Sequence, residues 1–395
     1  MLPFPAAVAP SVRIAGYFVA IFLIQGTYLP FFPVYMSLNG VSEAEIGLVI
    51  AAPMVMRIIA TPFTMVYADR LSDRRKALVL YSVCSLGIFS LLGFFSGFWP
   101  ILLIVSAMAV FWTAVLPLSD ALAVSLSRRD GANYGRMRLW GSIAFIGANL
   151  GAGAIVEARG GGSVYLLLVA GLALLVLGSL ILPKVERRPA QDEPGEGQSA
   201  FRLLSRPVFL LVLVAAGLAQ ASHAFLYGFG SIGWKALGFS GGEIGTLWAV
   251  GVIAEILLFW LSGSVLGRVG PIGLLAIGAG AGVVRWALLP FAGDFPTVFA
   301  VQILHGLTFG ATHLGIIHFV AGSLPERLAS TGQGLAATSV SAAMATMVAV
   351  SGPLYEAIGS KGYFLMAVLS AAALGILALA ALLSRRSPLT TTGVS

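Results

Sequence analysis

The chain has 395 residues, of which 58% are hydrophobic and 10% are charged, with a mean hydropathy of +0.96. Because a soluble domain carries about 25% charged residues, this composition excludes a soluble globular protein and predicts a polytopic membrane protein. The pI of 9.8 reflects an excess of Lys and Arg, which in a membrane protein marks cytoplasmic loops and not a surface for nucleic acid.

Apolar runs long enough to cross a bilayer recur along the whole chain, since a membrane helix needs about 20 such residues. In the first half they are 13–37, 44–68, 77–97, 99–124, 136–157 and 163–183. In the second half they are 207–233, 243–266, 272–292, 295–320, 332–357 and 361–383. The first run lacks a following small-residue cleavage site and is interpreted as a retained span. The sequence predicts an all-α membrane protein with 12 transmembrane helices.

The segment between the sixth and seventh runs is polar and includes residues 191–199, QDEPGEGQS, which cannot span a membrane. We therefore expect an N-terminal six-helix bundle at 1–183, a cytoplasmic linker at 184–206, and a C-terminal six-helix bundle with a short tail at 207–395.

Basic residues set the expected orientation. With the N-terminus in the cytoplasm, the outer loops hold Arg159, Lys235 and Lys361, and most other Lys and Arg residues fall on the inner side. This bias predicts that both termini are cytoplasmic. We expect a multi-pass protein of the cytoplasmic (inner) membrane of a bacterium.

An internal repeat relates the two halves. Residues 40–47 (GVSEAEIG) open the second run, and residues 238–245 (GFSGGEIG) open the eighth, 198 residues later. Six spans per half is an even number, so the halves share one orientation, as in transporters built from parallel repeats with a substrate site near the midplane. The alternative is a coincidence between two short Gly-rich loops.

Motifs in both halves carry a family resemblance. Residues 67–75 (YADRLSDRR) resemble the loop 2–3 motif of the major facilitator superfamily, with Met65 in place of its leading Gly. Residues 120–123 (DALA), 134–142 (YGRMRLWGS), 254–255 (AE), 284–286 (VRW) and 301–305 (VQILH) resemble the 3-phenylpropionic acid permease group. The resemblance implies a transporter fold of two parallel six-helix halves. It also implies that Asp69, Arg70 and Arg74 form a conformational loop motif.

The chain is similar, more distantly, to the lactose permease family. In that family an acid in span four and an Arg in span five contact the sugar, which implies substrate-binding roles for Asp120 and Arg138. Its span-nine Arg and span-ten His correspond to Arg285 and His305, and its span-eight Glu to Glu255.

This chain departs from that pattern in span ten. The family's acid after the His falls near Thr308, and its Lys falls near Gln302. Proton coupling would therefore use other groups, or the same groups differently.

Asp120 and Arg138 lie near the facing ends of two antiparallel spans and are expected to be partners. An ionisable residue inside a span is costly and is usually functional. The planar fork of Arg138 matches a carboxylate bidentately, so an anionic substrate could displace Asp120, which could also accept hydroxyls from a neutral substrate. The alternatives are a static pair between the two spans, or an Arg138 side chain that extends to the inner surface.

Glu255 lies deep in the eighth run and is our candidate for the proton carrier, and Asp120, Arg285 and His305 are predicted to take part in proton coupling with it. A buried carboxyl can exchange a proton as a cationic partner comes and goes. The alternative is a fixed ion pair with Arg285. Arg57 lies within the second run and also needs a partner. The sequence leaves open whether Arg57 is structural or functional.

Further polar residues lie on spans one, seven and ten, which line the pathway in the resembling fold. His305 and His313 fall on a broadly shared face of span ten. Span seven carries His223 and Tyr227, and span one carries Gln25 and Tyr28, with His223 matching Gln25 under the repeat; the alternative is interhelical hydrogen bonding. The predicted substrate-binding residues are Asp120, Arg138, Gln25, Tyr28, His223, Tyr227, His305 and His313.

We expect no cofactor and no metal. The His spacing on span ten does not suit a zinc site, and the single Cys84 excludes a multi-cysteine site. A membrane-embedded enzyme would need a nucleophile–base pair or a metal cluster at working spacing, and no Gly-rich nucleotide loop with a Lys is present.

The sequence therefore predicts a secondary transporter that works by alternating access in the lipid bilayer, as a monomer. The resemblance favours proton-coupled uptake of a small aromatic carboxylate, with H⁺ as co-substrate. A sugar or nucleoside symporter, a drug or sugar exporter, and a passive facilitator share the fold. The alternatives differ in substrate, in transport direction or in coupling, and these residues are compatible with each of them.

Overall fold

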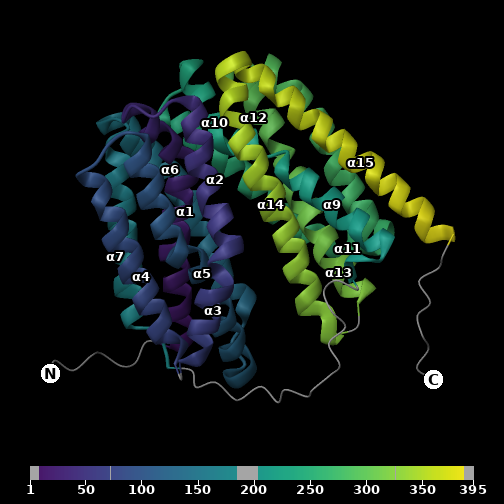
Figure 1. Ribbon diagram of the computed structural model, residues 1–395, viewed down its shortest axis with the longest axis horizontal. Helices are drawn as coiled ribbons and strands as arrows, with labels where there is room; N and C mark the ends of the chain where they lie inside the picture. Colours follow the sequence, from purple (N-terminus) through teal and green to yellow (C-terminus); the bar gives the residue numbers. More distant parts are fainter. Residues whose placement is uncertain (1–8, 72, 185–202, 325, 387–395) are drawn as a thin grey trace. The chain divides into compact units, whose positions relative to one another are not determined.

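The computed structural model describes residues 9–71, 73–184, 203–324 and 326–386, and the elements in these ranges are all helices (Figure 1). Ten helical segments in this part of the chain are long and apolar enough to cross a membrane. The number is eleven when α2 (Glu43–Ile59) and α3 (Thr61–Arg70), which meet at a bend of 48°, count as one span. The predicted class, an all-α polytopic membrane protein, is confirmed.

The last two predicted spans fall in one continuous helical segment, Thr331–Ser384, of 54 residues, which contains two α-helices. The short 3₁₀ helix η4 (Gly359–Gly362) divides it into α14 (Glu326–Ile358) and α15 (Tyr363–Arg386). Each predicted apolar run thus corresponds to helical structure.

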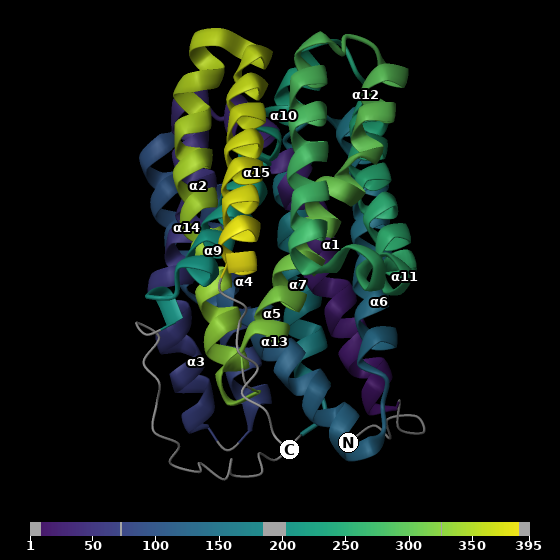
Figure 2. The same cartoon turned by 90° about the vertical axis from the view of Figure 1, so that its right-hand side faces the viewer.

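The helices of the first half pack on one another. These helices are α1 (Pro10–Leu38), α2, α3, α4 (Arg74–Ser90) with η1 (Leu91–Gly93), α5 (Phe98–Asp130), α6 (Tyr134–Arg159) and α7 (Ser163–Leu180). Helix α1 packs against α6 and α7, while α4 packs against α5 and α7, and α2 against α5. The close packing of α1, α4, α5 and α7 can be followed in Figures 1 and 2.

The second half begins with α9 (Pro207–Ala221) and α10 (Ala224–Ala236), which together fill one predicted span. Helix α11 (Gly241–Leu288) contains two predicted spans, because Gly270 has a positive φ of 68° that interrupts it. The short 3₁₀ helix η2 (Leu289–Phe291) follows. The next span consists of α12 (Phe295–Ile303), a π-helix η3 (Gly306–Ala311) and α13 (Thr312–Ser323).

The sequence repeat forms the same local structure twice. Ser42 and Glu45 form a reciprocal capping box at the start of α2. At the start of α11, Ser240 N donates to Glu243 Oε2 at 2.8 Å, and Glu243 N donates to Ser240 Oγ at 3.2 Å. A positive-φ glycine, Gly40 or Gly238, precedes each box. Such boxes satisfy backbone donors that a helix start leaves open, so a repeated sequence has produced a repeated helix start.

At the same two helix starts, glycines of other helices pack closely against the backbone. Gly153 of α6 packs directly against the Gly241 carbonyl of α11. A methyl group on Gly352 of α14 would lie 2.7 Å from the carbonyl oxygens of Glu43 and Ala44 in α2. Only glycine allows backbones to approach so closely.

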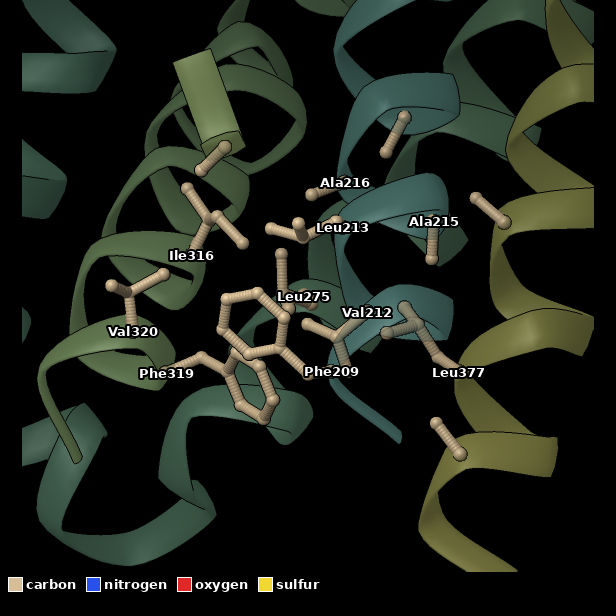
Figure 3. Close-up of a cluster of buried hydrophobic side chains, with 14 of the residues drawn as sticks. Phe209, Val212, Leu213, Ala215, Ala216, Leu275, Ile316, Phe319, Val320 and Leu377 are labelled. Carbon is tan, nitrogen blue, oxygen red and sulfur yellow. The ribbon is translucent and has the colours of Figure 1, made fainter. Parts of the chain in front are cut away.

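An apolar core joins α9, α11, α13 and α15. Figure 3 shows Phe209 of α9, Leu275 of α11, Ile316 and Phe319 of α13, and Leu377 of α15 pointing toward a common centre. The rings of Phe209 and Phe319 stack with centroids 6.0 Å apart. All five side chains are buried, so this core holds these four helices together.

The chain divides into two compact units. Unit 1 comprises Met1–Gln191, Tyr227–Ala249 and Ala349–Ala357, and unit 2 comprises Asp192–Leu226, Val250–Val348 and Ile358–Ser395. The predicted bundles at 1–183 and 207–395 stay a prediction, and residues 185–202 of the predicted linker lie outside the described residues.

Candidate functional site

The first cluster of predicted site residues lies in unit 1, where α5 meets α6. Tyr134 Oη donates a hydrogen bond of 3.0 Å to Asp120 Oδ1. Tyr134 is the first residue of α6, and its position is set by Asn133, whose side chain caps that helix by accepting from Arg136 N. The helix cap therefore brings a phenol to the half-buried carboxylate.

Arg138, one turn further along α6, lies on an aromatic face. Its Cζ is 4.0 Å from the centroid of the Phe22 ring and 5.7 Å from that of Phe18, both on α1. A cation over an aromatic ring gains up to about 2 kcal/mol when it is desolvated. A methyl group on Gly141 would collide with Phe22 and reach within 3.2 Å of Arg138 Nη1, so the glycine leaves room for this stacking.

Asp120 and Arg138 are thus neighbours, as predicted, but their contact differs from the expected direct pair. Arg138 acts electrostatically on Asp120, and Tyr134 has both of them as electrostatic neighbours. In the described part of the chain, the hydrogen bond to the carboxylate comes from Tyr134. The guanidinium prefers Phe22 because a half-buried cation gains from the ring face.

Gln25 and Tyr28 lie on α1, as predicted, and both are half-buried. The Tyr28 ring stacks on Phe32 at 4.6 Å. Its hydroxyl is buried and has no hydrogen-bond partner among the residues that the structure describes. Tyr227, also in unit 1, lies 5.9 Å from the ring of Trp248.

The second cluster lies in unit 2 around Arg285, whose side chain is fully buried. Its guanidinium donates from Nη1 to Thr308 Oγ1 at 2.8 Å and from Nη2 to Gln302 Oε1 at 2.7 Å. Nη1 also lies 3.1 Å from His305 Nδ1, and Cζ lies 4.5 Å from the Trp286 ring. Hydrogen bonds to charged groups are the stronger kind, so this arginine is firmly held.

His223 joins the same cluster from the break between α9 and α10. Its Nε2 lies 3.0 Å from Thr308 Oγ1, and its Nδ1 lies 3.0 Å from the Gln220 carbonyl oxygen. The break exists because Ser222 and His223 do not continue the helix of α9. The neighbouring Ser222 Oγ accepts from Trp286 Nε1 at 2.9 Å, so α11 is hydrogen-bonded to the break through Ser222.

The span-ten histidines form a stacked series with Phe309. The rings of His305 and Phe309 are 5.3 Å apart and those of Phe309 and His313 are 5.9 Å apart, with interplanar angles of 14° and 10°. The predicted shared face of His305 and His313 is therefore observed. His318 is half-buried further along α13.

Glu255 lies on α11 against the π-helix, since a methyl group on Gly310 would be 3.6 Å from Glu255 Cγ. A methyl on Gly306 would lie 2.6 Å from the Ala254 carbonyl oxygen, which shows how tightly η3 packs on α11. The proton-carrier role of Glu255 stays a prediction, and so does the alternative pairing with Arg285.

The predicted loop motif is described in part. Arg70 ends α3 with an exposed side chain, and Arg74 begins α4, with Nη1 3.5 Å from Ser125 Oγ on α5. The side chain of Asp69 lies outside the described residues. Arg57 lies in the last turn of α2, just before the bend.

Sequence reasoning missed several members of the two clusters. Gln302 and Thr308 bind Arg285 at the positions where the lactose permease family has a Lys and an acid. Tyr134 and Phe22 were not singled out either, although Tyr134 lies in a motif that carried the family resemblance. In the described ranges, no group of three or more His, Cys, Asp or Glu could hold a metal ion.

Comparisons with known proteins agree on a family. The sequence profile of the MFS_1 like family matches residues 12–366. Over 362 residues the chain is 31% identical to the probable 3-phenylpropionic acid transporter of Escherichia coli strain K12, covering 90% of this chain and 93% of that protein. It is 26% identical over 330 residues to the maltose permease of Geobacillus stearothermophilus, covering 81% of each.

The fold is similar to the crystal structure of the nucleoside transporter NupG, with a TM-score of 0.80 and 16% identity over 95% of this chain and 99% of that one. At 16% identity this likeness shows the fold alone, whereas the family profile and the 31% identity show the family. The profile match over most of the chain and the 31% identity together show that this chain belongs to the MFS_1 like family of major facilitator superfamily transporters.

Proposed function

We propose that this transporter takes up a small aromatic carboxylate, resembling 3-phenylpropionate, together with a proton, by alternating access. The observation that carries the proposal is the 31% identity to the probable 3-phenylpropionic acid transporter over 90% of the chain. The cluster around Arg138 supports it, because its chemistry suits both ends of such a molecule.

The Arg138 guanidinium is a fork that binds a carboxylate bidentately. It lies on Phe22, and aromatic rings pair favourably with a further phenyl ring in stacked or edge-to-face geometry. The stacked guanidinium makes no close ion pair with Asp120 in the described structure. A substrate carboxylate could therefore bind it without first displacing an acid.

Proton coupling follows from the charge of the substrate. Moving one negative charge inward against an inside-negative potential costs about 2.3 kcal/mol per 100 mV. A proton carried with the anion removes that cost. Glu255 and Asp120 are the acidic candidates for carrying it.

A neutral hydroxylated substrate, a sugar or a nucleoside, is the second candidate. The observation that favours it is the hydrogen-bonded pair of Asp120 and Tyr134, which offers both acceptors and a donor to hydroxyl groups. The maltose permease and the nucleoside transporter are relatives or structural neighbours with such substrates in their names. An exporter or a passive facilitator of the same fold would differ in direction or in coupling.

We further propose that the protein resides in the bacterial inner membrane as a monomer, with both termini cytoplasmic. Thiol labelling of intact cells tests the orientation in a Cys84→Ser background. A cysteine at Ser96, which is exposed between α4 and α5, should react with an impermeant reagent. A cysteine at Asn133, between α5 and α6, should react only after the membrane is opened.

The experiment for the substrate is uptake of radiolabelled 3-phenylpropionate into proteoliposomes, with and without an inward proton gradient. The variants are Arg138→Ala, Arg138→Lys and Arg136→Ala. Arg136 is exposed on the same helix and is the matched control. We expect accumulation by the wild type and by Arg136→Ala, and a loss of about 10-fold to 100-fold in Arg138→Ala, because a hydrogen bond to a charged group contributes about 1.5–3 kcal/mol.

Arg138→Lys keeps the charge but loses the fork, so we expect intermediate uptake. No uptake by a folded wild-type protein would remove the aromatic carboxylate, and a panel of sugars and nucleosides would follow. Uptake that ignores the gradient would indicate a facilitator.

A further inference from the structure

When the His223 ring is neutral, its two hydrogen bonds can each run in only one direction. A carbonyl oxygen can only accept, so the contact with the Gln220 carbonyl places the ring proton of His223 on Nδ1. The neutral ring then presents Nε2 as an acceptor, and the Thr308 hydroxyl must donate to it. The oxygen of the same hydroxyl accepts from Arg285 Nη1. Thr308 thus links the cation to the histidine.

His305 is fixed in the opposite tautomer. A guanidinium has no acceptor, so His305 Nδ1 accepts from Arg285 Nη1 and its ring proton is on Nε2. Adding a proton to Nδ1 would place two N–H groups face to face and break this contact. His305 can therefore become a cation only by giving up Arg285.

His223 differs because its acceptor nitrogen faces a hydroxyl, which can donate or accept. A proton that binds to Nε2 forms a new N–H bond, and this N–H donates to Thr308 Oγ1. The Thr308 O–H bond stays intact and rotates toward the His305 carbonyl oxygen, 3.4 Å away. Thr308 Oγ1 can still accept from Arg285, since a hydroxyl has two lone pairs. Every hydrogen bond of the neutral state thus has a counterpart in the protonated state.

We propose that His223 is a proton-binding site of the transport cycle, and that Thr308 is the positioning residue that lets it bind and release the proton. This inference rests on the proposed proton-coupled function. It assigns a proton to a histidine at a helix break, where the sequence suggested only a substrate contact.

Several charged or titratable groups surround His223 and act on its proton. Arg285 of α11 and His305 beside η3 face it directly. Glu255 of α11 lies against the same η3 helix, and Tyr363 of α15 stacks on the Trp286 ring that meets His223 edge-on. A second cation next to Arg285 in this buried cluster is unfavourable. This repulsion sets how far the pH must fall before His223 takes up a proton.

The test measures the ring nitrogens and needs no substrate. Full-length protein with ¹⁵N-labelled histidine rings is studied by solid-state NMR in lipid bilayers from about pH 8 down to about pH 3, because burial and the neighbouring Arg285 both oppose a charge on His223. Single His→Gln variants assign the four histidines. The substitutions are Thr308→Val, Thr308→Ser, and Thr312→Val as the matched control. Thr312 is equally buried, and its hydroxyl donates to the Thr308 backbone oxygen instead of to a histidine.

We expect His223 to show the Nδ1–H tautomer at high pH and an imidazolium signal as the pH falls, while His305 keeps its Nε2–H tautomer. Thr308→Ser and Thr312→Val should behave like the wild type. Thr308→Val should need a pH about one unit lower for the same imidazolium signal, because the charged form loses the stronger hydrogen bond.

A His223 ring that stays neutral throughout, or a His305 ring that charges first, would overturn the proposal, and both are read from the wild type alone. Equal titration in Thr308→Val would remove the role of Thr308. If 3-phenylpropionate is not transported, the substrate assignment fails, but this measurement of His223 keeps its meaning.

Discussion

The two clusters each centre on an arginine within a membrane span, yet they hold it in different ways. Arg138 in unit 1 is half-buried and rests on the face of Phe22, with Tyr134 and Asp120 as its polar neighbours. Arg285 in unit 2 is fully buried and directs its N–H groups to Gln302, Thr308 and His305. Arg285 is therefore held by hydrogen bonds to the protein's own side chains, whereas Arg138 is held mainly by its contact with an aromatic ring.

This difference shows that a charge in a membrane span is not by itself evidence of a binding site. The number and direction of the protein's own hydrogen bonds decide how much of the cation is left for a substrate. On that measure Arg138 is the stronger candidate for substrate contact, and we propose that Arg285 acts through its neighbours His305 and Thr308.

The largest expected effect is on the stability of unit 2. Arg285→Lys replaces a five-donor fork by a single ammonium, which cannot reach Gln302 and Thr308 together. Leaving buried partners unsatisfied costs about 1–3 kcal/mol each, so we expect the apparent Tm to fall by roughly 5–10 °C. A thiol-reactive dye reads the half-buried Cys84 in unit 1, and circular dichroism, which follows the helices of both units, measures the change expected in unit 2. Arg138→Lys is the control and should shift Tm by less than about 2 °C; equal shifts would erase the comparison.

A smaller effect is expected from Tyr134→Phe, which removes the hydrogen bond to Asp120. A neutral-donor bond contributes about 1 kcal/mol net, so the same dye should report a decrease in Tm of roughly 2–4 °C. The control is Tyr165→Phe, since its half-buried hydroxyl also makes one hydrogen bond, to the Ser90 carbonyl at 2.9 Å. A drop as large as that of Arg285→Lys would mean that the first cluster is scaffold too.

The smallest effect concerns Asp294, the exposed cap of α12, outside the membrane spans. Its carboxylate accepts from Thr297 N at 3.0 Å and from Thr297 Oγ1 at 2.8 Å, and these hydrogen bonds lower the pKa of Asp294. Because the folded-state pKa is the lower one, the stabilisation is complete above the unfolded-state pKa of about 4 and is lost as pH falls through the folded value.

Melting curves of wild type and Asp294→Ala at several pH values check this. Their difference should be small and constant above about pH 5 and should shrink in more acidic solution. Asp294 then contributes nothing to any change in transport between about pH 5 and about pH 8. A difference that grows on acidification would contradict the assigned cap.

Much of the fold could be predicted from local patterns. Apolar runs mark spans, and the Ser–Glu spacing of residues 42–45 and 240–243 marks helix starts, because both depend on residues close in sequence. The prominence of Asp120, Arg138, Arg285 and His305 was also predictable, since polar side chains within apolar runs are few.

The partners of these residues were harder to predict. Gln302 and Thr308 are neutral and give no charge signal, and they reach Arg285 from two different elements, α12 and the π-helix η3. Phe22 is one of 24 phenylalanines, so its sequence neighbourhood does not distinguish it. The direct pairing expected for Asp120 and Arg138 neglected Tyr134, which lies at the very start of α6 and is placed there by its cap.

The close glycine contacts of unit 1 affect how easily its helices can separate. At Gly153 with Gly241, and at Gly352 with Glu43 and Ala44, the helices touch through backbone atoms. Contacts of this kind bury no rotamers, so parting the helices frees little side-chain entropy, and rejoining them requires no side chain to find its place again. Helices that meet through such backbone contacts can separate and re-form their contact many times, because no side chain has to return to a particular rotamer.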